Sequence, residues 1–258
     1  STPNDEAPMF GWLFGSSCPL DPDAKAWVET RLLWLRDEFG ADDLYGKPLV
    51  LPTDEFFPEP YDGSRPAVRR LFRRVCDYMG VRPAAVRLEF LRPAANPLFL
   101  VNDGGEAVPT EAAGLYEGAV IRVNEGETAD PMSLVGTLAH ELAHQRLLGE
   151  GRIDPDVYDH ELLTDLAVVF HGLGVFLANV PRHWDGNHTT WPDSDRRKPE
   201  YMTGPMFAYA LASVAWVRRD DRPYWARHLR SGVRAEFAQS LRFLRKTGDT
   251  RLRPLPRR

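Results

Sequence analysis

The sequence is poor in cysteine, the residue that cross-links many small extracellular folds. Only Cys18 and Cys76 occur among 258 residues, and they lie far apart in the chain. A disulfide framework therefore cannot be what stabilises the fold. Apolar residues at helical spacing surround Cys76, which favours a small core side chain over a reactive thiol. With 43% hydrophobic and 27% charged residues, the composition is that of a globular protein with a substantial core.

Long apolar runs are also missing. No segment approaches the roughly 18 consecutive apolar residues that a membrane-spanning helix needs. The first ten residues, STPNDEAPMF, lack the basic start and apolar stretch of a signal peptide. We therefore expect a cytoplasmic protein with no membrane partner.

Positive charge is not in excess. The chain has 32 Lys and Arg residues and 37 Asp and Glu residues, so the net charge is −5. This balance provides no general electrostatic reason to bind nucleic acid. Basic residues do cluster within 67–79 and near the C-terminus, but such runs are usually solvated surface. We expect no nucleic-acid partner.

The apolar periodicity predicts an α+β fold that is mostly helical. We expect residues 1–20 to form an extended arm and residues 21–258 a single domain, with a core at 85–178 and a helical C-terminal part at 200–246. Helices are expected at 22–39, 67–79, from 131 onward, at 160–178, 204–218 and 233–246, and a long loop at 41–66. Strands are expected at 85–91 and 119–123, the second in a hairpin turning near Gly118. The small sheet should pack on the helix that starts at 131, with the other helices added at both ends.

That helix carries the motif on which the functional argument rests. The segment LVGTLAHELAHQRLLGE contains His140, Glu141 and His144, an HExxH pattern within a helical periodicity. Residues four apart share one helix face, so both imidazoles can reach one Zn²⁺ ion. Glu141 is turned by about 100° from His140 and can take a proton from a zinc-bound water. Two surface histidines on an ordinary amphipathic helix are the less favoured interpretation, because the whole motif is in register.

A catalytic zinc needs three protein ligands and one open position. The following segment, DHELLTDLAVVFHGLGVF, offers His160, Glu161, Asp165 and His171. Glu161 and Asp165 share a face, so we expect Glu161 to bind the metal and Asp165 to accept the free N–H of a ligand histidine. His160 and Asp165 stay open as alternative third ligands. His171 is interpreted as a core histidine or one that supports the ligands.

An HExxH helix followed by Glu161 and Asp165 in a Glu-x-x-x-Asp pattern resembles the gluzincin metallopeptidases, which include the thermolysin-type enzymes. The resemblance covers Ala119–Ala178 and includes the strand that lies along the substrate in gluzincins. The chain is also similar to small single-domain gluzincins, to the ImmA/IrrE-type regulatory peptidases and to uncharacterised bacterial proteins with a HELAH core. The metzincin pattern is absent, since Leu147 and Glu150 stand where it requires Gly and His.

This resemblance implies zinc-dependent hydrolysis of peptide bonds in a peptide or protein substrate. It also implies a Tyr or His that stabilises the oxyanion, for which Tyr201 and His183 are the leading candidates, with His188 and Tyr209 behind them. The alternative is a regulatory or partner-binding protein with a gluzincin core and restricted or no proteolytic activity. A purely structural zinc is disfavoured because four ligands would close such a site. The sequence leaves substrate identity and oligomeric state open.

Overall fold

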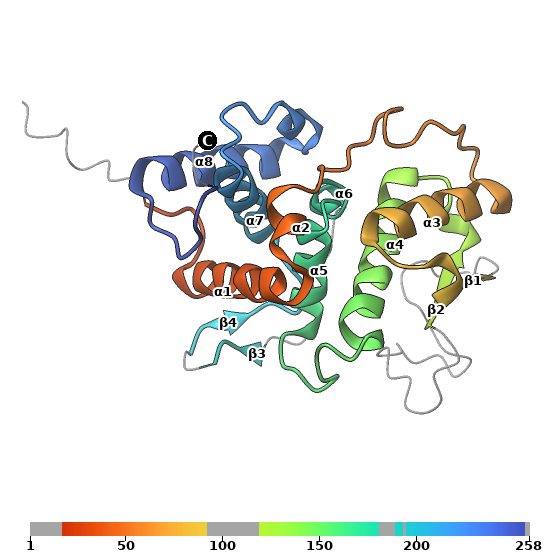
Figure 1. Cartoon of the computed structure of the whole chain (residues 1–258), viewed down its shortest axis with the longest axis horizontal. Helices are drawn as coiled ribbons and strands as arrows, with labels where there is room; N and C mark the ends of the chain where they lie inside the picture. Colours follow the sequence, from red (N-terminus) through yellow and green to blue (C-terminus); the bar gives the residue numbers. More distant parts are fainter. Residues whose placement is uncertain (1–16, 92–118, 181–188, 193–194, 256–258) are drawn as a thin grey trace, which may run out of the picture.

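The computed structural model describes residues 17–91, 119–180, 189–192 and 195–255. It is mostly helical, with two small sheets of two strands each (Figure 1). The helices are α1 Pro22–Phe39, α2 Ala41–Tyr45, α3 Arg65–Met79, α4 Pro131–His144, α5 His160–Phe170, α6 Gly174–Asn179, α7 Gly204–Val217 and α8 Ser231–Thr247. The strands are β1 Val86–Leu91, β2 Ala119–Asn124, β3 Thr189–Thr190 and β4 Arg197–Lys198. Short 3₁₀ turns lie at Pro83–Ala85, Glu125–Glu127 and Tyr224–His228, and a π-helical turn at Gln145–Gly149. The predicted mostly helical α+β class is confirmed at this level.

Helix starts follow the local capping chemistry of the sequence. Asp21 caps α1 by accepting hydrogen bonds from two backbone N–H groups, and Pro22 occupies the first helical position. Asp130 caps α4 in the same way, accepting from the N–H of Met132. Gly80 ends α3 in the left-handed conformation, with φ of 69°. These boundaries agree with the predicted ones to within two residues.

Two predicted boundaries are wrong. The segment 41–66 is not loop throughout, because α2 occupies Ala41–Tyr45 directly after α1. The single helix predicted at 160–178 is divided into α5 and α6. The break occurs at Gly172, whose φ is +92°, and a Cβ there would lie 2.6 Å from the carbonyl oxygen of Pro48. The Gly172 carbonyl instead accepts a hydrogen bond from the N–H of Val50, so a distant loop sets the end of the helix.

The larger sheet is parallel. β1 pairs with β2 in a register that runs from Val86 opposite Ala119 to Leu91 opposite Asn124. The predicted strands at 85–91 and 119–123 are thus confirmed. The hairpin partner predicted before Gly118 lies outside the described residues, as does most of the predicted arm at 1–20. The antiparallel pair β3–β4 was not predicted.

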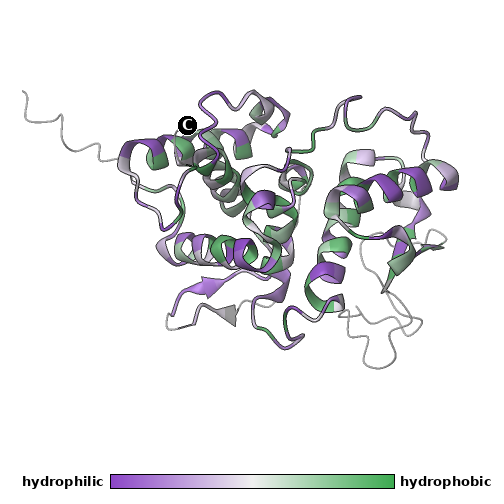
Figure 2. Ribbon diagram, in the orientation of Figure 1, coloured by the Kyte–Doolittle hydropathy of each residue, from purple (hydrophilic) through white to green (hydrophobic). Residues whose placement is uncertain are grey.

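The core is centred on α5. Every residue of α5 from Leu162 to Phe170 is buried, and α5 packs against α1, α4, α6 and α7. Helix α3 is amphipathic, and Figure 2 shows it with its hydrophilic face turned outward. Cys76 is fully buried in this core, and burial raises the pKa of its thiol to about 12, so it is a packing residue as expected. Among the described helices, none combines the length and the apolar content that spanning a bilayer requires.

Candidate metal centre

Two histidines one helical turn apart form the base of the site. His140 and His144 lie on the same face of α4, and both are more than 90% buried. Their Nε2 atoms are 3.1 Å apart, and their rings meet edge to face with centroids 4.7 Å apart. The i, i+4 spacing of α4 therefore directs both imidazoles toward one point.

The start of α5 brings a carboxylate to the same point. Glu161 Oε2 lies 3.2 Å from His140 Nε2 and 3.4 Å from His144 Nε2. Ligand atoms at about 2.0–2.2 Å from a tetrahedral zinc lie about 3.3–3.6 Å from one another. The three atoms form a nearly equilateral triangle close to that size, so His140, His144 and Glu161 can hold a metal ion.

The outer nitrogen of each ring decides which tautomer faces this point. His140 Nδ1 lies 2.9 Å from Asp165 Oδ1, a carboxylate oxygen that can only accept, so the proton is on Nδ1. His144 Nδ1 lies 3.2 Å from Thr164 Oγ1, whose own proton is donated to the His160 carbonyl oxygen at 2.8 Å. The hydroxyl is therefore an acceptor, and His144 Nδ1 is also protonated. In the neutral rings, both Nε2 lone pairs then face Glu161, as metal ligation requires.

The electrostatics of the cluster favour a cation. Glu161 Oε2 is buried and has no hydrogen-bond partner among the described residues. Burial disfavours a charge on His140, but Asp165 and Glu161 outweigh that effect and raise its pKa to about 10. Burial likewise opposes ionisation of Glu161, yet the neighbouring histidines hold its pKa far below the usual range. A positive charge between these three side chains, a metal ion or a proton, satisfies all of them.

A buried ion pair from α1 holds the start of α5 in place. Asp159, immediately before α5, is 1% exposed. Arg31 donates to both of its carboxylate oxygens at 2.7 Å, and Trp27 Nε1 donates at 2.6 Å. The position of Glu161 thus depends on two side chains more than a hundred residues earlier. Sequence reasoning missed this contact, because no local pattern pairs these positions.

Asp165 connects the cluster to a further segment. Its second oxygen, Oδ2, accepts a hydrogen bond from the backbone N–H of Met202 at 2.9 Å. This bond holds the chain next to Tyr201, whose ring centroid lies 5.9 Å from that of His140. Of the expected oxyanion stabilisers, Tyr201 is therefore beside the cluster. His183 and His188 lie outside the described residues.

The other candidates have different surroundings. His160 Nε2 lies 3.4 Å from Glu161 Oε1, the oxygen that faces away from the two other histidines. His171 is fully buried and donates from Nδ1 to Asp43 Oδ2 at 2.9 Å, a core position as expected. Tyr209 is buried in α7 and donates to Glu29 Oε1 at 2.6 Å.

Glu141 lies on α4 between the two histidines in sequence and is half-buried. Its carboxylate makes no hydrogen bond or ion pair with the described residues. Its negative charge contributes to the raised pKa of His140, the residue directly before it in α4. A carboxylate that directly follows a candidate ligand on the helix, with no hydrogen bond or ion pair to the described residues, is available to accept a proton.

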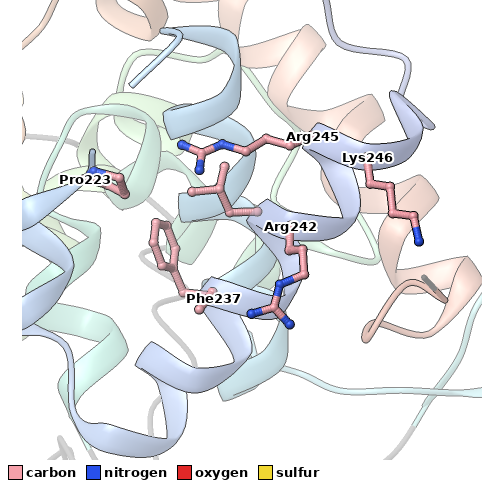
Figure 3. A pocket seen from close by; sticks show the side chains of 7 residues that line it. Pro223, Phe237, Arg242, Arg245 and Lys246 are labelled. Atoms are coloured by element: carbon pink, nitrogen blue, oxygen red, sulfur yellow. The ribbon is translucent and has the colours of Figure 1, made fainter. Parts of the chain in front are cut away.

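A surface hollow of about 470 Å³ lies away from this cluster, on α8. Phe237 and Pro223 form its apolar side (Figure 3). Arg242, Arg245 and Lys246 surround it, and Arg245 donates to the backbone oxygen of Asp220 at 2.7 Å. The hollow shares no lining residue with the metal centre.

Comparison of the chain with protein-family models, curated proteins and solved structures finds no match.

Proposed function

We propose that the protein is a zinc-dependent hydrolase that cleaves peptide bonds. The observation that carries the proposal is the convergence of three lone-pair atoms, from His140, His144 and Glu161, with both histidines held in the ligating tautomer. Two imidazoles and one carboxylate are a donor set typical of catalytic zinc. The described residues supply three ligands, which leaves a position for water, whereas a structural zinc is closed by four.

A zinc ion in this set would act as a Lewis acid and lower the pKa of a bound water to about 7. Glu141 would accept the proton from that water and transfer it to the departing amine nitrogen. Tyr201, next to His140, could donate its phenol proton to the oxygen that becomes negative as water attacks the carbonyl. Asp165 would keep His140 in the correct tautomer throughout.

The substrate would bind in extended form along β2. One edge of β2 pairs with β1, and among the described residues no strand pairs with the other edge. A peptide could add to that edge through backbone hydrogen bonds, which suit substrates of varied sequence. The short connection from β2 to α4 makes this strand the natural candidate, since α4 carries the histidines.

The test is metal analysis of the purified protein, followed by incubation with an unbiased peptide library. We expect one zinc per chain and cleavage of many peptides, both lost in a His140→Ala/His144→Ala variant. Cleavage of nothing until a partner protein is added would favour the regulatory alternative instead. A protein that binds no zinc, or binds iron in preference, would contradict the proposal.

A further inference from the structure

A second cavity, of about 220 Å³, lies between α3, the first turn of α4 and the loop 52–61. Three buried side chains from three different helices form its apolar base, Leu71 of α3, Val135 of α4 and Phe176 of α6. The ligand atoms of the metal centre do not line it. A cavity of about 150 Å³ is enough to bind benzene, so this one has room for a hydrophobic side chain and a few polar atoms.

Few polar groups line this cavity, and one of them lacks a hydrogen-bond partner among the described residues. The hydroxyl of Thr53 is buried without a hydrogen-bond partner among the described residues. Such a group costs about 1–3 kcal/mol unless something satisfies it.

The charges at the rim are one positive and one negative side chain without ionic partners among the described residues. Arg70 makes a single long hydrogen bond, 3.4 Å to the Pro60 carbonyl oxygen, and no ion pair with the described residues. Asp54 makes neither a hydrogen bond nor an ion pair with them. Glu59 also lines the cavity, but Arg74 neutralises it. The rim therefore presents two exposed charges above an apolar base, Asp54 and Arg70, and the negative charges of Glu59 and Asp62 lie within reach of the Arg70 charge.

We propose that this cavity is a binding site for a free apolar amino acid, such as leucine or phenylalanine, in its zwitterionic form. The side chain would occupy the apolar base, the carboxylate would pair with Arg70, and the ammonium group would pair with Asp54. An uncharged apolar molecule would leave both rim charges unused, and a molecule with one charge would use only one. The proposal does not depend on the metal centre or on peptide hydrolysis.

The test is isothermal titration of the full chain with leucine, phenylalanine, N-acetyl-leucine and leucinamide. We expect saturable binding of one molecule of leucine or phenylalanine per chain. Because each analogue lacks one of the two charges, we expect each to bind about tenfold more weakly than leucine. The same titrations on a His140→Ala/His144→Ala variant should give unchanged affinities, since the cavity is separate from the metal centre.

Two cavity variants and one matched control locate the binding. Arg70→Gln should weaken leucine binding about tenfold and abolish the preference for leucine over leucinamide, since the carboxylate contact is gone. Arg73→Gln is the control, because Arg73 is exposed on the same helix and does not line the cavity. Ala67→Leu should abolish binding by filling the cavity, which Ala67 lines. Circular dichroism and thermal melting establish that each variant is folded.

Several results would overturn the proposal. One is the absence of saturable binding by either amino acid to the full chain. Another is N-acetyl-leucine or leucinamide binding as tightly as leucine, which would exclude recognition of the zwitterion. Loss of binding in the double histidine variant, with no effect of Arg70→Gln, would place the ligand at the metal centre. Binding of longer peptides alone would indicate a partner protein as the occupant.

Discussion

At the scale of single residues, the metal centre depends on which atoms around the two histidines are hydrogen-bond donors and which are acceptors. His140 and His144 each donate the Nδ1 proton to an oxygen, so in the neutral rings their Nε2 lone pairs face Glu161. The Thr164 hydroxyl donates its proton to the His160 carbonyl oxygen within α5. It can therefore only accept from His144 Nδ1, which keeps the proton of His144 on that nitrogen. Removing a side chain that touches only the outer nitrogen should therefore weaken metal binding without abolishing it.

Zinc content separates these roles. We expect Glu161→Ala to lose nearly all zinc, Asp165→Ala to bind zinc about 10- to 100-fold more weakly, and Thr164→Val to lie at the mild end of that range. His160→Ala should keep zinc, because His160 Nε2 contacts Glu161 Oε1 and not the oxygen that faces the two other histidines. Competition with a chelator of known affinity measures all four. If His160→Ala emptied the site while Glu161→Ala stayed filled, a three-histidine site would replace the one proposed.

The proposed general base is tested by an isosteric change. Glu141→Gln preserves shape but cannot accept a proton, so we expect kcat to fall about 10²- to 10⁴-fold with zinc content unchanged. Peptide cleavage and metal analysis on the same preparation provide the two readouts. Glu55→Gln serves as control, since Glu55 is exposed and makes no hydrogen bond or ion pair with the described residues. Near-native activity in the Glu141→Gln variant would rule out the mechanism.

At the scale of elements, the end of α5 is determined by a close approach rather than by helix propensity. Gly172 combines a left-handed φ with a contact that leaves no room for a Cβ beside Pro48. That contact ties α5 to the segment after α2, through the hydrogen bond from Val50. A residue with any side chain there must distort the backbone or move the loop.

We therefore expect Gly172→Ala to lower the free energy of unfolding by about 2–4 kcal/mol. Gly232→Ala is the matched control: a Cβ at this position in α8 meets nothing within 4 Å. That variant should be neutral or more stable by up to about 1 kcal/mol, because alanine favours helix. Urea unfolding of both variants and the wild type measures the difference. Equal stability of the Gly172→Ala variant and the wild type would show that the loop yields without cost.

At the scale of the whole molecule, a buried titratable side chain makes stability depend on pH. His171 is fully buried in contact with Phe39, and Lys47 and Arg146 add positive charge nearby. Desolvation is the main reason that its pKa falls to about 4, although the hydrogen bond to Asp43 opposes the shift. An unfolded histidine has a pKa of about 6.5. Below that pH the unfolded chain binds the proton more readily than the folded one.

The stability from this group is thus complete above about pH 6.5 and is lost as the pH falls toward 4, by about 3 kcal/mol in total. His171→Asn keeps a donor for Asp43 but does not titrate, so its stability should fall less over this range. Urea unfolding of both proteins at pH 7, 6 and 5 measures the two slopes. Parallel slopes would mean that His171 takes up its proton equally in both states.

The sequence by itself determined the features that depend on neighbours along the chain. Local geometry explains the helix caps at Asp21 and Asp130, the strand alternation at 85–91 and the shared face of His140 and His144. These features depend only on residues close together in sequence. The roles of Glu141 and Glu161 were inferred from the same periodicity and are still proposals.

Only the tertiary structure decided which distant groups meet. Arg31 and Trp27 hold Asp159, the Met202 backbone reaches Asp165, and the Pro48 carbonyl ends α5 at Gly172. The parallel pairing of β1 with β2 and the cavity beside α4 also bring together segments that are distant in the sequence. The physical reason is that helical and strand periodicities repeat over a few residues. These periodicities therefore predict which face of an element is buried, but not which other element packs against that face.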